Sequence, residues 1–416
     1  MCEVRVVITG MGAINAGGEN VDACWEGIKE KKIFFSPVIF ENKNITARFF
    51  SFLRTDEHRY NRLPKSLTHF LPESGRLALE SCRQAVCQAF GKEGTPTEYY
   101  DNFDCGVILG TGWGGLDSAG DFACQYQAAG ITHPKSNLIT MTGSMTAACA
   151  MMYGLKGYQN TIMAACATGT MAIGDAYEII RSGRAKCMLA GGTESLRKEF
   201  SIWSIDILKA LSKETDNLEG ASCPFSLNRS GFVMAEGSAV VCLEEYESAV
   251  TRGATILAEV KGYAQYGDGM NITRPAEDVA SLSNTIKMAI ERSGLSINEV
   301  DYINAHGTST QLNDLYETRA IRKVFGRQAY SIPVSSTKSY TGHLIGAAGS
   351  FETIVCVKSI NENLMPATLN LHHPDPECDL NYLPNEHLYG SSLRVALNIS
   401  AGFGGHNAAL VIVKAE

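Results

Sequence analysis

The chain has 416 residues and a net charge of −8 at pH 7, which argues against a general nucleic-acid-binding or anionic-membrane-binding surface. Its 45% hydrophobic residues and 40 glycines fit a globular enzyme that is large enough for more than one structural unit. No apolar run approaches the roughly 18 residues of a membrane span, and 13 irregularly spaced cysteines without a CxxC pair indicate free thiols in a cytoplasmic protein.

The first part of the chain alternates buried strands with helices. Its first residues, MCEVRVVITG, lead into a strand pattern rather than into a signal peptide. Continuous apolar runs closed by small residues predict strands over residues 4–13, 104–115, 185–194 and 237–245. Helical periodicity covers residues 74–90 and 171–184. This alternation predicts an α/β architecture.

A second cycle begins near residue 256. A strand is predicted over residues 255–264, and Leu282, Ile286, Ala289 and Ile290 form one helical face that ends at Gly294. Segments 300–310 and 332–350 each run from a strand into a loop, and residues 393–416 supply two last strands around a glycine turn. We therefore predict two α/β halves, 1–250 and 251–416, packed as one body because no linker separates them.

Two segments imitate cofactor sites. Gly110, Gly112 and Gly115 match the dinucleotide-binding pattern G-x-G-x-x-G, but no second strand follows at the required distance, so NAD binding is not expected. The segment HHPDPEC (372–378) crowds metal-ligand residue types together, yet its prolines favour a surface loop over a zinc site. We expect no cofactor.

Cys166 stands in the small-residue turn AACATG, between an apolar strand and an amphipathic helix. The first-turn amides and the positive end of the helix dipole favour a thiolate there. The same amides are placed to hold an oxyanion at a carbonyl under attack. This motif alone leaves two interpretations open, a buried small hydrophobe and a nucleophile.

Two of the nine histidines decide between these interpretations. His306 in NAHGTST and His343 in TKSYTGHLIGAAG both stand in glycine-flanked loops after predicted strands. Together with Cys166 they suggest a Cys-His-His constellation. Lys338 and Glu352 flank His343, and as an ion pair they would fix the charge and orientation of the imidazoles.

A final glycine loop completes the candidate site. It runs over Gly402, Phe403, Gly404 and Gly405, and its glycines allow the backbone to approach a substrate closely. We expect Phe403 to gate access to the thiol and its amide to act as a second oxyanion donor.

These motifs resemble the β-ketoacyl-acyl carrier protein synthases, the condensing enzymes of bacterial fatty acid and type II polyketide synthesis. The resemblance spans nearly the whole chain and includes VVITGMGA, ACATG, AGGTE, NAHGTST, SSTKSYTGHLIGAAG and GFGGHN, in that order. It implies a thiolase-like fold, with two pseudo-symmetric halves in a five-layered αβαβα arrangement, and a dimer.

The resemblance also implies roles for individual residues. Cys166 takes an acyl group as a thioester, and His306 and His343 assist decarboxylation of a malonyl unit and stabilise the enolate. Lys338 and Glu352 act as the supporting ion pair, and the amides of Cys166 and Phe403 form the oxyanion hole. Thr308 and Thr310 resemble residues that contact the phosphopantetheine arm.

The expected partners are an acyl carrier protein and a second subunit. Carrier proteins of this class are acidic, so docking requires a local basic patch on an acidic chain. Residues 54–65 offer Arg54, Arg59, Arg62 and Lys65, and the resemblance places them near the mouth of the acyl tunnel. The second subunit is either another copy or a chain-length-factor homologue.

Departures from the family pattern bear on the pathway. Trp113 stands where a small aliphatic residue usually lines the acyl pocket, Ala401 replaces one of two gating aromatics, and His406 replaces a threonine. The arginine/lysine-methionine-aspartate signature of housekeeping enzymes is missing before the helix at residues 74–90. These departures favour a type II polyketide or polyene pathway, with housekeeping fatty acid elongation as the alternative.

Two other functions are less favoured. A non-catalytic chain-length factor is disfavoured because Cys166 and both histidines are present, and a degradative thiolase because no cysteine follows Cys378.

Overall fold

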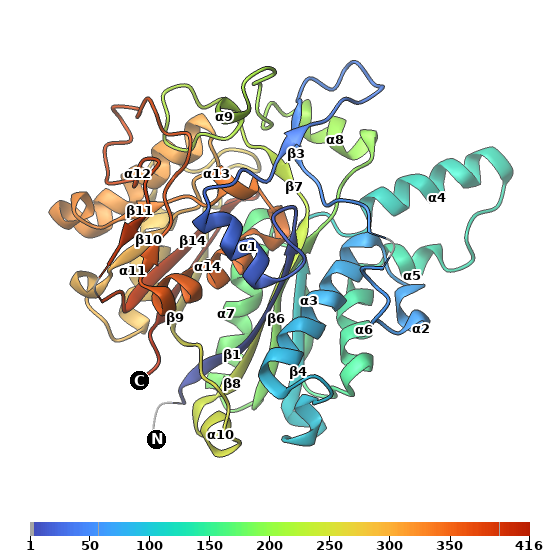
Figure 1. Cartoon of the computed structure of the whole chain (residues 1–416). Helices are drawn as coiled ribbons and strands as arrows, with labels where there is room; N and C mark the ends of the chain where they lie inside the picture. Colours follow the sequence, from blue (N-terminus) through green and yellow to red (C-terminus); the bar gives the residue numbers. More distant parts are fainter. Residues whose placement is uncertain (1–3, 57, 391) are drawn as a thin grey trace.

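The computed structural model describes residues 4–56, 58–390 and 392–416, and both predicted cycles are visible in its strands (Figure 1). The first half contributes β1 (Val6–Asn15), β4 (Cys105–Thr111), β5 (Gln159–Ile162), β6 (Cys187–Glu194) and β8 (Gly237–Glu245). The second half contributes β9 (Ala258–Gly267), β10 (Tyr302–Asn304), β11 (Val334–Ser335), β14 (Val395–Gly402) and β15 (His406–Val413). Each predicted strand is present, although β10 and β11 are much shorter than the segments that predicted them.

The ten strands are hydrogen-bonded in the order β11-β10-β14-β15-β9-β1-β8-β6-β4-β5. Counted outward from the central strands β1 and β9, the first two strand pairings in each half are antiparallel and the next two are parallel. The two halves meet where β1 pairs antiparallel with β9, from Val6 opposite Val260 to Ile8 opposite Ala258. The predicted pseudo-symmetry is therefore confirmed.

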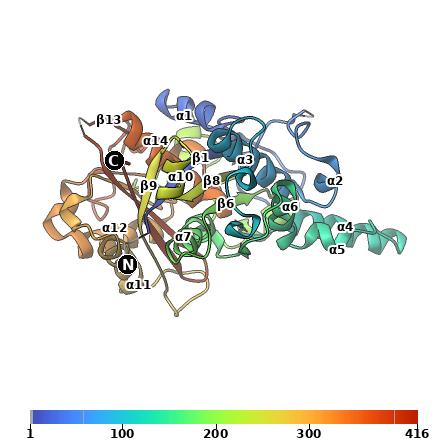
Figure 2. The same cartoon turned by 90° about the horizontal axis from the view of Figure 1, so that it is seen from below.

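Helices complete five layers. Between the two halves of the sheet, α7 (Thr168–Arg181) packs against α14 (Ala348–Glu362). The outer face of the first half is covered by α3 (Glu73–Phe90) and α6 (Gly143–Tyr153), and that of the second by α11 (Ala280–Arg292) and α12 (Gln311–Phe325). Figures 1 and 2 show these helices on opposite sides of the molecule, which is the predicted αβαβα arrangement.

The two central helices begin in equivalent ways. Each follows a single 3-10 turn, η3 (Ala165–Ala167) before α7 and η6 (Ile345–Ala347) before α14. The first residues of these turns, Ala165 and Ile345, have φ angles of 47° and 49°. The helices touch at Gly169 and Gly349. A Cβ atom on Gly169 would lie 2.6 Å from the Ser350 backbone nitrogen, and one on Gly349 would lie 1.9 Å from the Thr170 hydroxyl oxygen. This close approach brings together the two turns with their helix starts, which we call the η3 and η6 elbows. Cys166 lies in the η3 elbow.

One pair of helices leaves the body of the protein. No residue of α4 (Leu116–Ala129) is buried, and α4 and α5 (Ser136–Thr140) project to one side in both views (Figures 1 and 2). After the glycine run at 110–115, α4, α5 and α6 come before the next strand, β5, so no second strand follows at the distance that a dinucleotide-binding unit requires.

The remaining elements are short. They include α1 (Val21–Lys29), β2 (Ser36–Pro37), β3 (Phe49–Ser51), α2 (Lys65–Thr68), α8 (Glu199–Asp206), α9 (Leu218–Ala221), β7 (Met234–Ala235), α10 (Tyr246–Thr251), α13 (Lys338–Thr341), β12 (Leu364–Met365) and β13 (Leu388–Tyr389). Within the described residues, no helix combines the length and the apolar character that crossing a bilayer requires.

Candidate active site

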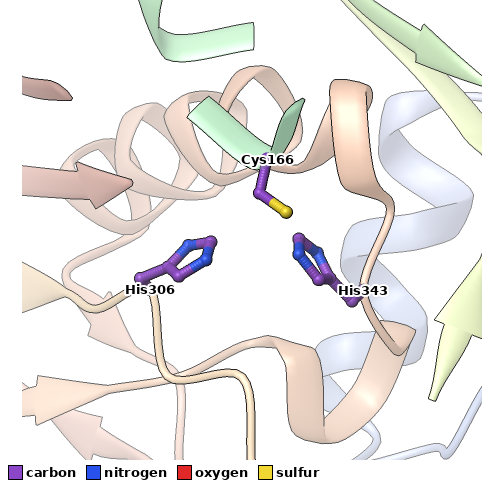
Figure 3. Close-up of side chains that lie close together, drawn as sticks. All are labelled: Cys166, His306 and His343. Carbon is purple, nitrogen blue, oxygen red and sulfur yellow. The ribbon is translucent and has the colours of Figure 1, made fainter. Parts of the chain in front are cut away.

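Cys166 lies at the centre of the η3 elbow and its side chain is buried. The turn is closed by a hydrogen bond of 3.0 Å from the Ala167 amide to the Ala164 carbonyl, and the Thr168 hydroxyl accepts from the Ala164 amide at 2.9 Å. The elbow thus points the sulfur away from α7 and toward segments of the second half. Figure 3 shows the sulfur directed between the rings of His306 and His343.

His306 follows β10, and its position is fixed from two sides. Its amide and that of Gly307 donate to the buried carboxylate of Glu317 on α12, at 2.6 and 2.8 Å. Its ring nitrogen Nδ1 lies 3.4 Å from Nζ of Lys338. Since an ammonium group can only donate, Nδ1 is the acceptor and the ring proton is on Nε2.

His343 follows α13 and is fixed in the same way by different groups. Its backbone pairs with the 232–235 segment, donating to the Val233 carbonyl at 2.7 Å. Its Nδ1 accepts a hydrogen bond of 3.3 Å from the Ile345 amide, while its buried Nε2 has no partner among the described residues. His343 therefore also carries its proton on Nε2, and that N–H group is free to donate into the site.

The two imidazoles are neutral donors that face one thiol. Their ring centroids are 5.3 Å apart at an interplanar angle of 82°. Burial, followed by the positive charge of Lys338, lowers the pKa of both His306 and His343 well below 6.5. Two neutral Nε2–H groups beside a nucleophile can bind a developing enolate oxygen without taking up a proton.

The neutral state of the imidazoles predicts a pH profile. Because their pKa values lie well below 6.5, both rings stay neutral from about pH 8 to about pH 6. We expect the rate of malonyl decarboxylation, measured as CO2 release by Cys166→Ala to remove the thiol's titration, to be constant over this range. A fall centred near pH 6.5 would contradict the assignment, since it would report an unperturbed histidine.

A metal ion is the other ligand that these groups suggest. The sulfur of Cys166 and one nitrogen of each imidazole all lie within 4.8 Å of one another, and zinc prefers such ligands. A histidine that binds zinc through Nε2 donates its Nδ1–H to an acceptor. Here both Nδ1 atoms face donors, Lys338 and the Ile345 amide. The surroundings fit hydrogen-bond donation into the site and not metal coordination.

Lys338 and Glu352 form a buried ion pair beside His306. The Lys338 ammonium donates to the Glu352 carboxylate, and the two side chains are 2% and 3% exposed. Burial raises the pKa of Glu352, and the positive charge of Lys338 opposes that rise. The structure thus brings together these two residues, which the sequence analysis paired, and links them to His306.

The thiol differs from its predicted state. The helix start was expected to favour a thiolate, but burial raises the pKa of Cys166 to about 12. The charge of Lys338 and the Phe403 amide, which donates to the sulfur, lower this pKa only in part. Desolvation of a charged sulfur outweighs the nearby dipoles, so the resting thiol is protonated.

A cavity of about 440 Å³ leads to the thiol. It is lined by Cys166, His306, His343, Thr308, Thr310 and Ala401, among others. The hydroxyls of Thr308 and Thr310 are hydrogen-bonded to each other at 2.9 Å. The predicted arm-binding threonines therefore share the cavity with the predicted catalytic residues.

The predicted gate lies against the Cys166 elbow. Gly402 and Phe403 line the cavity, whereas Gly404 is exposed. A Cβ atom on Gly402 would lie 3.0 Å from both the Ala164 carbonyl oxygen and the Cys166 amide nitrogen, so a side chain here would crowd the Cys166 turn. The imidazole of His406 packs against Gly404, where a Cβ atom would lie 2.9 Å from its Nε2.

Trp113 belongs to the apolar surroundings of the site. It does not line the cavity but packs against an apolar cluster that contains Cys166, Phe232 and Ile345. Its amide and that of Gly112 donate to buried Glu194, at 3.3 and 2.8 Å. The indole is thus part of the apolar packing around the cluster that contains Cys166.

The predicted docking residues need a correction. Arg59 is not available to a partner, because its guanidinium makes a two-bond pair with Glu19 at 2.9 and 2.7 Å and its side chain is only 5% exposed. Arg62 and Lys65 are exposed but do not line the cavity. The exposed basic residues that do line it are Lys209, Lys213 and Arg274.

Two residues of the site were not singled out from the sequence. Glu317 fixes the His306 loop, and Phe232 packs edge-on against His343 with ring centroids 5.1 Å apart. Asp314 and Glu317 lie three residues apart on the buried face of α12. Two acids on an apolar helix face are an unusual pattern that could have revealed Glu317, whereas nothing distinguishes Phe232 from other core aromatics.

The comparisons with known proteins cover the whole chain. Residues 3–249 match the family model of the β-ketoacyl synthase N-terminal domain, and residues 257–372 match that of the C-terminal domain. A 3-oxoacyl-[acyl-carrier-protein] synthase 2 from Synechocystis is 39% identical over 99% of this chain and 98% of that protein. The protein of the same name from Coxiella burnetii is 36% identical, with 98% of each chain covered.

Solved structures give the same fold. A type II polyketide synthase ketosynthase, in complex with its acyl carrier protein and bound to the hexaketide, superposes with a TM-score of 0.88 at 32% identity, covering 99% of this chain and 100% of that one. The ishigamide ketosynthase/chain length factor gives 0.90 at 27% identity, with full coverage of both chains. A β-ketoacyl synthase from Burkholderia phymatum gives 0.90 at 30%, covering 99% of this chain and 100% of that one.

Proposed function

The chain belongs to the β-ketoacyl synthase family and is an acyltransferase of the condensing type, and from that premise we propose how its own residues perform the condensation. The observation that carries the proposal is the convergence of the Cys166 sulfur with two imidazoles whose Nε2–H groups face it. The substrates are an acyl group and a malonyl unit, each carried as a thioester on the phosphopantetheine of an acyl carrier protein.

The first step is acyl transfer. The Cys166 sulfur attacks the acyl thioester carbonyl, a C–S bond to Cys166 forms, and the bond to the pantetheine sulfur breaks. The amides of Cys166 and Phe403 bind the oxyanion. The thiol proton leaves with the pantetheine thiol, so the step is neutral overall even though the resting thiol is protonated.

The second step is decarboxylative condensation. The malonyl thioester loses CO2, and the enolate oxygen that forms accepts hydrogen bonds from Nε2–H of His306 and of His343. The enolate carbon attacks the acyl thioester, a C–C bond forms, and the Cys166 thiolate leaves and regains a proton. The product is a β-ketoacyl thioester two carbons longer, and the proposed reaction uses no metal or nucleotide.

A reconstituted assay tests this function. The purified chain is incubated with acyl- and malonyl-loaded carrier protein, and CO2 and the β-ketoacyl product are quantified. The proposal requires both in equal amounts. Release of CO2 without C–C bond formation in the acylated enzyme would contradict it.

We further propose that the pathway is type II polyketide or polyene synthesis. Three features support it: Trp113 packed against the apolar cluster that contains Cys166, Ala401 in place of a gating aromatic, and His406 against the gate glycine. Housekeeping fatty acid elongation is the second candidate, favoured by relatives named 3-oxoacyl-[acyl-carrier-protein] synthase 2 at 36% to 39% identity. Turnover of ordinary saturated acyl chains of increasing length, with full activity for the chain alone, would favour this second candidate.

The pathway proposal predicts the effect of removing the indole. Trp113→Ala is expected to extend the longest saturated acyl group that loads Cys166 by several carbons, because it opens apolar volume beside the sulfur. The control Trp203→Ala removes an indole of the same apolar cluster, on α8, while leaving Trp113 in place. An unchanged length limit in Trp113→Ala, or an equal change in both variants, would contradict a specific role for Trp113.

We propose that the carrier protein docks at the cavity mouth through Lys209, Lys213 and Arg274. These side chains are exposed, and no carboxylate of the described residues pairs with them. Reversing all three charges to glutamate is expected to raise the KM for carrier-bound malonate about tenfold, and less so at high salt. The KM for malonyl-pantetheine should stay unchanged. A larger effect from Arg62→Glu with Lys65→Glu would assign docking to that pair instead.

A second subunit is proposed on the side of the projecting helices. Within the described residues, edge strand β5 has an unpaired outer side. The segment from α4 to the residue after α5 exposes Tyr126, Ile131, Leu138 and Met141. Exposed edges and apolar side chains of this kind are usually covered. The occupant is a second copy or a chain-length-factor homologue, and sedimentation of the purified chain alone distinguishes them.

A further inference from the structure

A buried arginine stands behind the cavity wall and takes no part in the steps above. The side chain of Arg229 is 1% exposed and does not line the cavity. The cavity is lined by the three residues that follow it, Ser230 to Phe232, and also by Thr308, Thr310, Gln311, Leu312 and Asn313. Arg229 therefore adjoins one segment of the cavity lining and is hydrogen-bonded to another.

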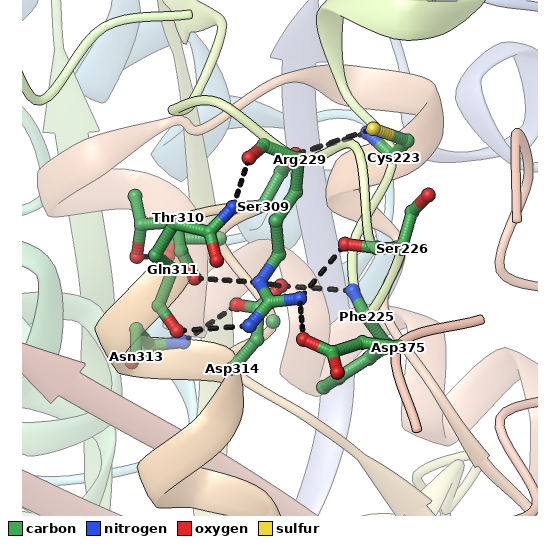
Figure 4. A network of polar contacts seen from close by, with 12 residues as sticks. Cys223, Phe225, Ser226, Arg229, Ser309, Thr310, Gln311, Asn313, Asp314 and Asp375 are labelled. Carbon is green, nitrogen blue, oxygen red and sulfur yellow. Dashed lines mark hydrogen bonds and ion pairs between the residues drawn. The ribbon is translucent and has the colours of Figure 1, made fainter. Parts of the chain in front are cut away.

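The guanidinium binds both of these segments (Figure 4). Its Nε donates to the Thr310 carbonyl at 3.1 Å, and one terminal nitrogen donates to the Gln311 carbonyl at 2.9 Å. The other terminal nitrogen donates to the Ser226 carbonyl at 2.8 Å and to Asp375 at 2.6 Å. The planar fork thus fixes three backbone carbonyls relative to one another.

These contacts are more than charge neutralisation. The Thr310 carbonyl also accepts from the Asp314 amide at 3.3 Å within α12, so it does not depend on Arg229 for a partner. Arg229 also forms ion pairs with Asp375 and, at 3.6 Å, with the buried Asp314. Buried ion pairs contribute little net stability, and neutralising these two acids would not by itself require a fork on two adjacent carbonyls. What the guanidinium adds is the position of Thr310, where α12 begins.

Further bonds join the same segments. The Gln311 side chain donates back to the Arg229 carbonyl at 2.5 Å, and the Gly231 amide donates to the Ser309 carbonyl at 3.0 Å. Ser309 and Phe225 have φ angles of 67° and 64°. Non-glycine residues hold such left-handed conformations only where their surroundings impose them. The Arg229 bonds are part of what imposes them.

We propose that Arg229 is a positioning residue for the pantetheine subsite, holding the Thr308 and Thr310 hydroxyls where the arm of the substrate passes. This inference rests on the proposed function. Loss of Arg229 should weaken substrate binding and leave the chemical step unchanged, because the His306 backbone is held independently by Glu317. Loss of the fork therefore displaces the threonines more than the imidazole.

The test compares two malonyl thioesters that differ in the length of their arm. CO2 release is measured with malonyl-pantetheine and with malonyl-N-acetylcysteamine, which lacks the outer part of the arm. Arg229→Lys keeps the charge but loses the fork, and it is expected to raise the KM for malonyl-pantetheine about tenfold. The KM for malonyl-N-acetylcysteamine should change less than about twofold, and kcat should be retained with both.

A second variant keeps the inference testable if Arg229→Lys does not fold. Asp375→Asn weakens the hold on the guanidinium from a surface loop and should raise only the malonyl-pantetheine KM, by about threefold. The matched controls are Arg322→Lys and Asp379→Asn, an exposed ion pair that should leave both KM values unchanged. The inference would be overturned by an equal rise in KM with both thioesters, by a fall in kcat alone, or by no effect of Arg229→Lys. If Arg229→Lys does not fold, the absence of an effect of Asp375→Asn would overturn it. Wild-type protein that releases no CO2 from either thioester would instead contradict the proposed function.

Discussion

Replacing His343 by alanine is expected to slow malonyl decarboxylation by about 10²–10³-fold, because it removes one of two donors to the enolate oxygen. The remaining donor, Nε2–H of His306, does not depend on His343, since its tautomer is set by Lys338. Transfer of an acyl group onto Cys166 uses the backbone amides and should proceed in the variant. CO2 release and acyl-enzyme formation are therefore measured separately.

Two further variants sharpen this prediction. His343→Gln offers an amide N–H in place of the imidazole donor and should recover part of the lost rate. The control His372→Ala removes an exposed histidine that pairs with Glu219 at 3.3 Å and does not line the cavity. A His343→Ala variant that decarboxylates at the wild-type rate, or one that fails in acyl transfer alone, would contradict the assigned role.

Replacing Lys338 by alanine is expected to have two effects of different origin. It leaves the buried Glu352 carboxylate unpaired, which should cost about 3–5 kcal/mol of unfolding free energy. It also removes the donor that holds the His306 Nδ1, so the Nε2–H tautomer is no longer imposed. We expect decarboxylation to fall by about 10²-fold. Denaturant unfolding and CO2 release measure the two effects.

A double variant separates stability from catalysis. Lys338→Met with Glu352→Leu replaces the ion pair by apolar side chains of similar size, which should restore most of the unfolding free energy. It supplies no donor to His306, so the decarboxylation rate should stay low. Recovery of both quantities would mean that Lys338 acts only on stability, and the tautomer argument would then be wrong.

The arrangement of the fold was largely predictable from the sequence, because buried parallel strands and amphipathic helices leave clear patterns. The predicted strand over residues 237–245 agrees with β8 (Gly237–Glu245). The strands in segments 300–310 and 332–350 reduce to the short β10 and β11. In the first of these, the apolar run gives way to the His306 loop, whose amides donate to Glu317 instead of to a neighbouring strand.

The site was predictable as a set of residues but not as an electrostatic environment. Motif order brings Cys166, His306 and His343 together, but the tautomer of His343 depends on the Ile345 amide in a strained elbow. The charge state of Cys166 depends on burial, which no local pattern reports. The pairing of Arg59, predicted as a docking residue, was not predictable because its partner, Glu19, lies 40 residues away in the sequence.

Intact-protein mass spectrometry tests the central claim, that Cys166 is the acyl acceptor of a decarboxylating condensing enzyme. The purified chain is incubated with acyl-loaded carrier protein, and the mass added to the protein and its position are determined. We expect one acyl group on Cys166, absent in Cys166→Ala and lost with product formation when malonyl carrier protein is added. An acyl group on another residue, or one that persists in Cys166→Ala, would contradict it.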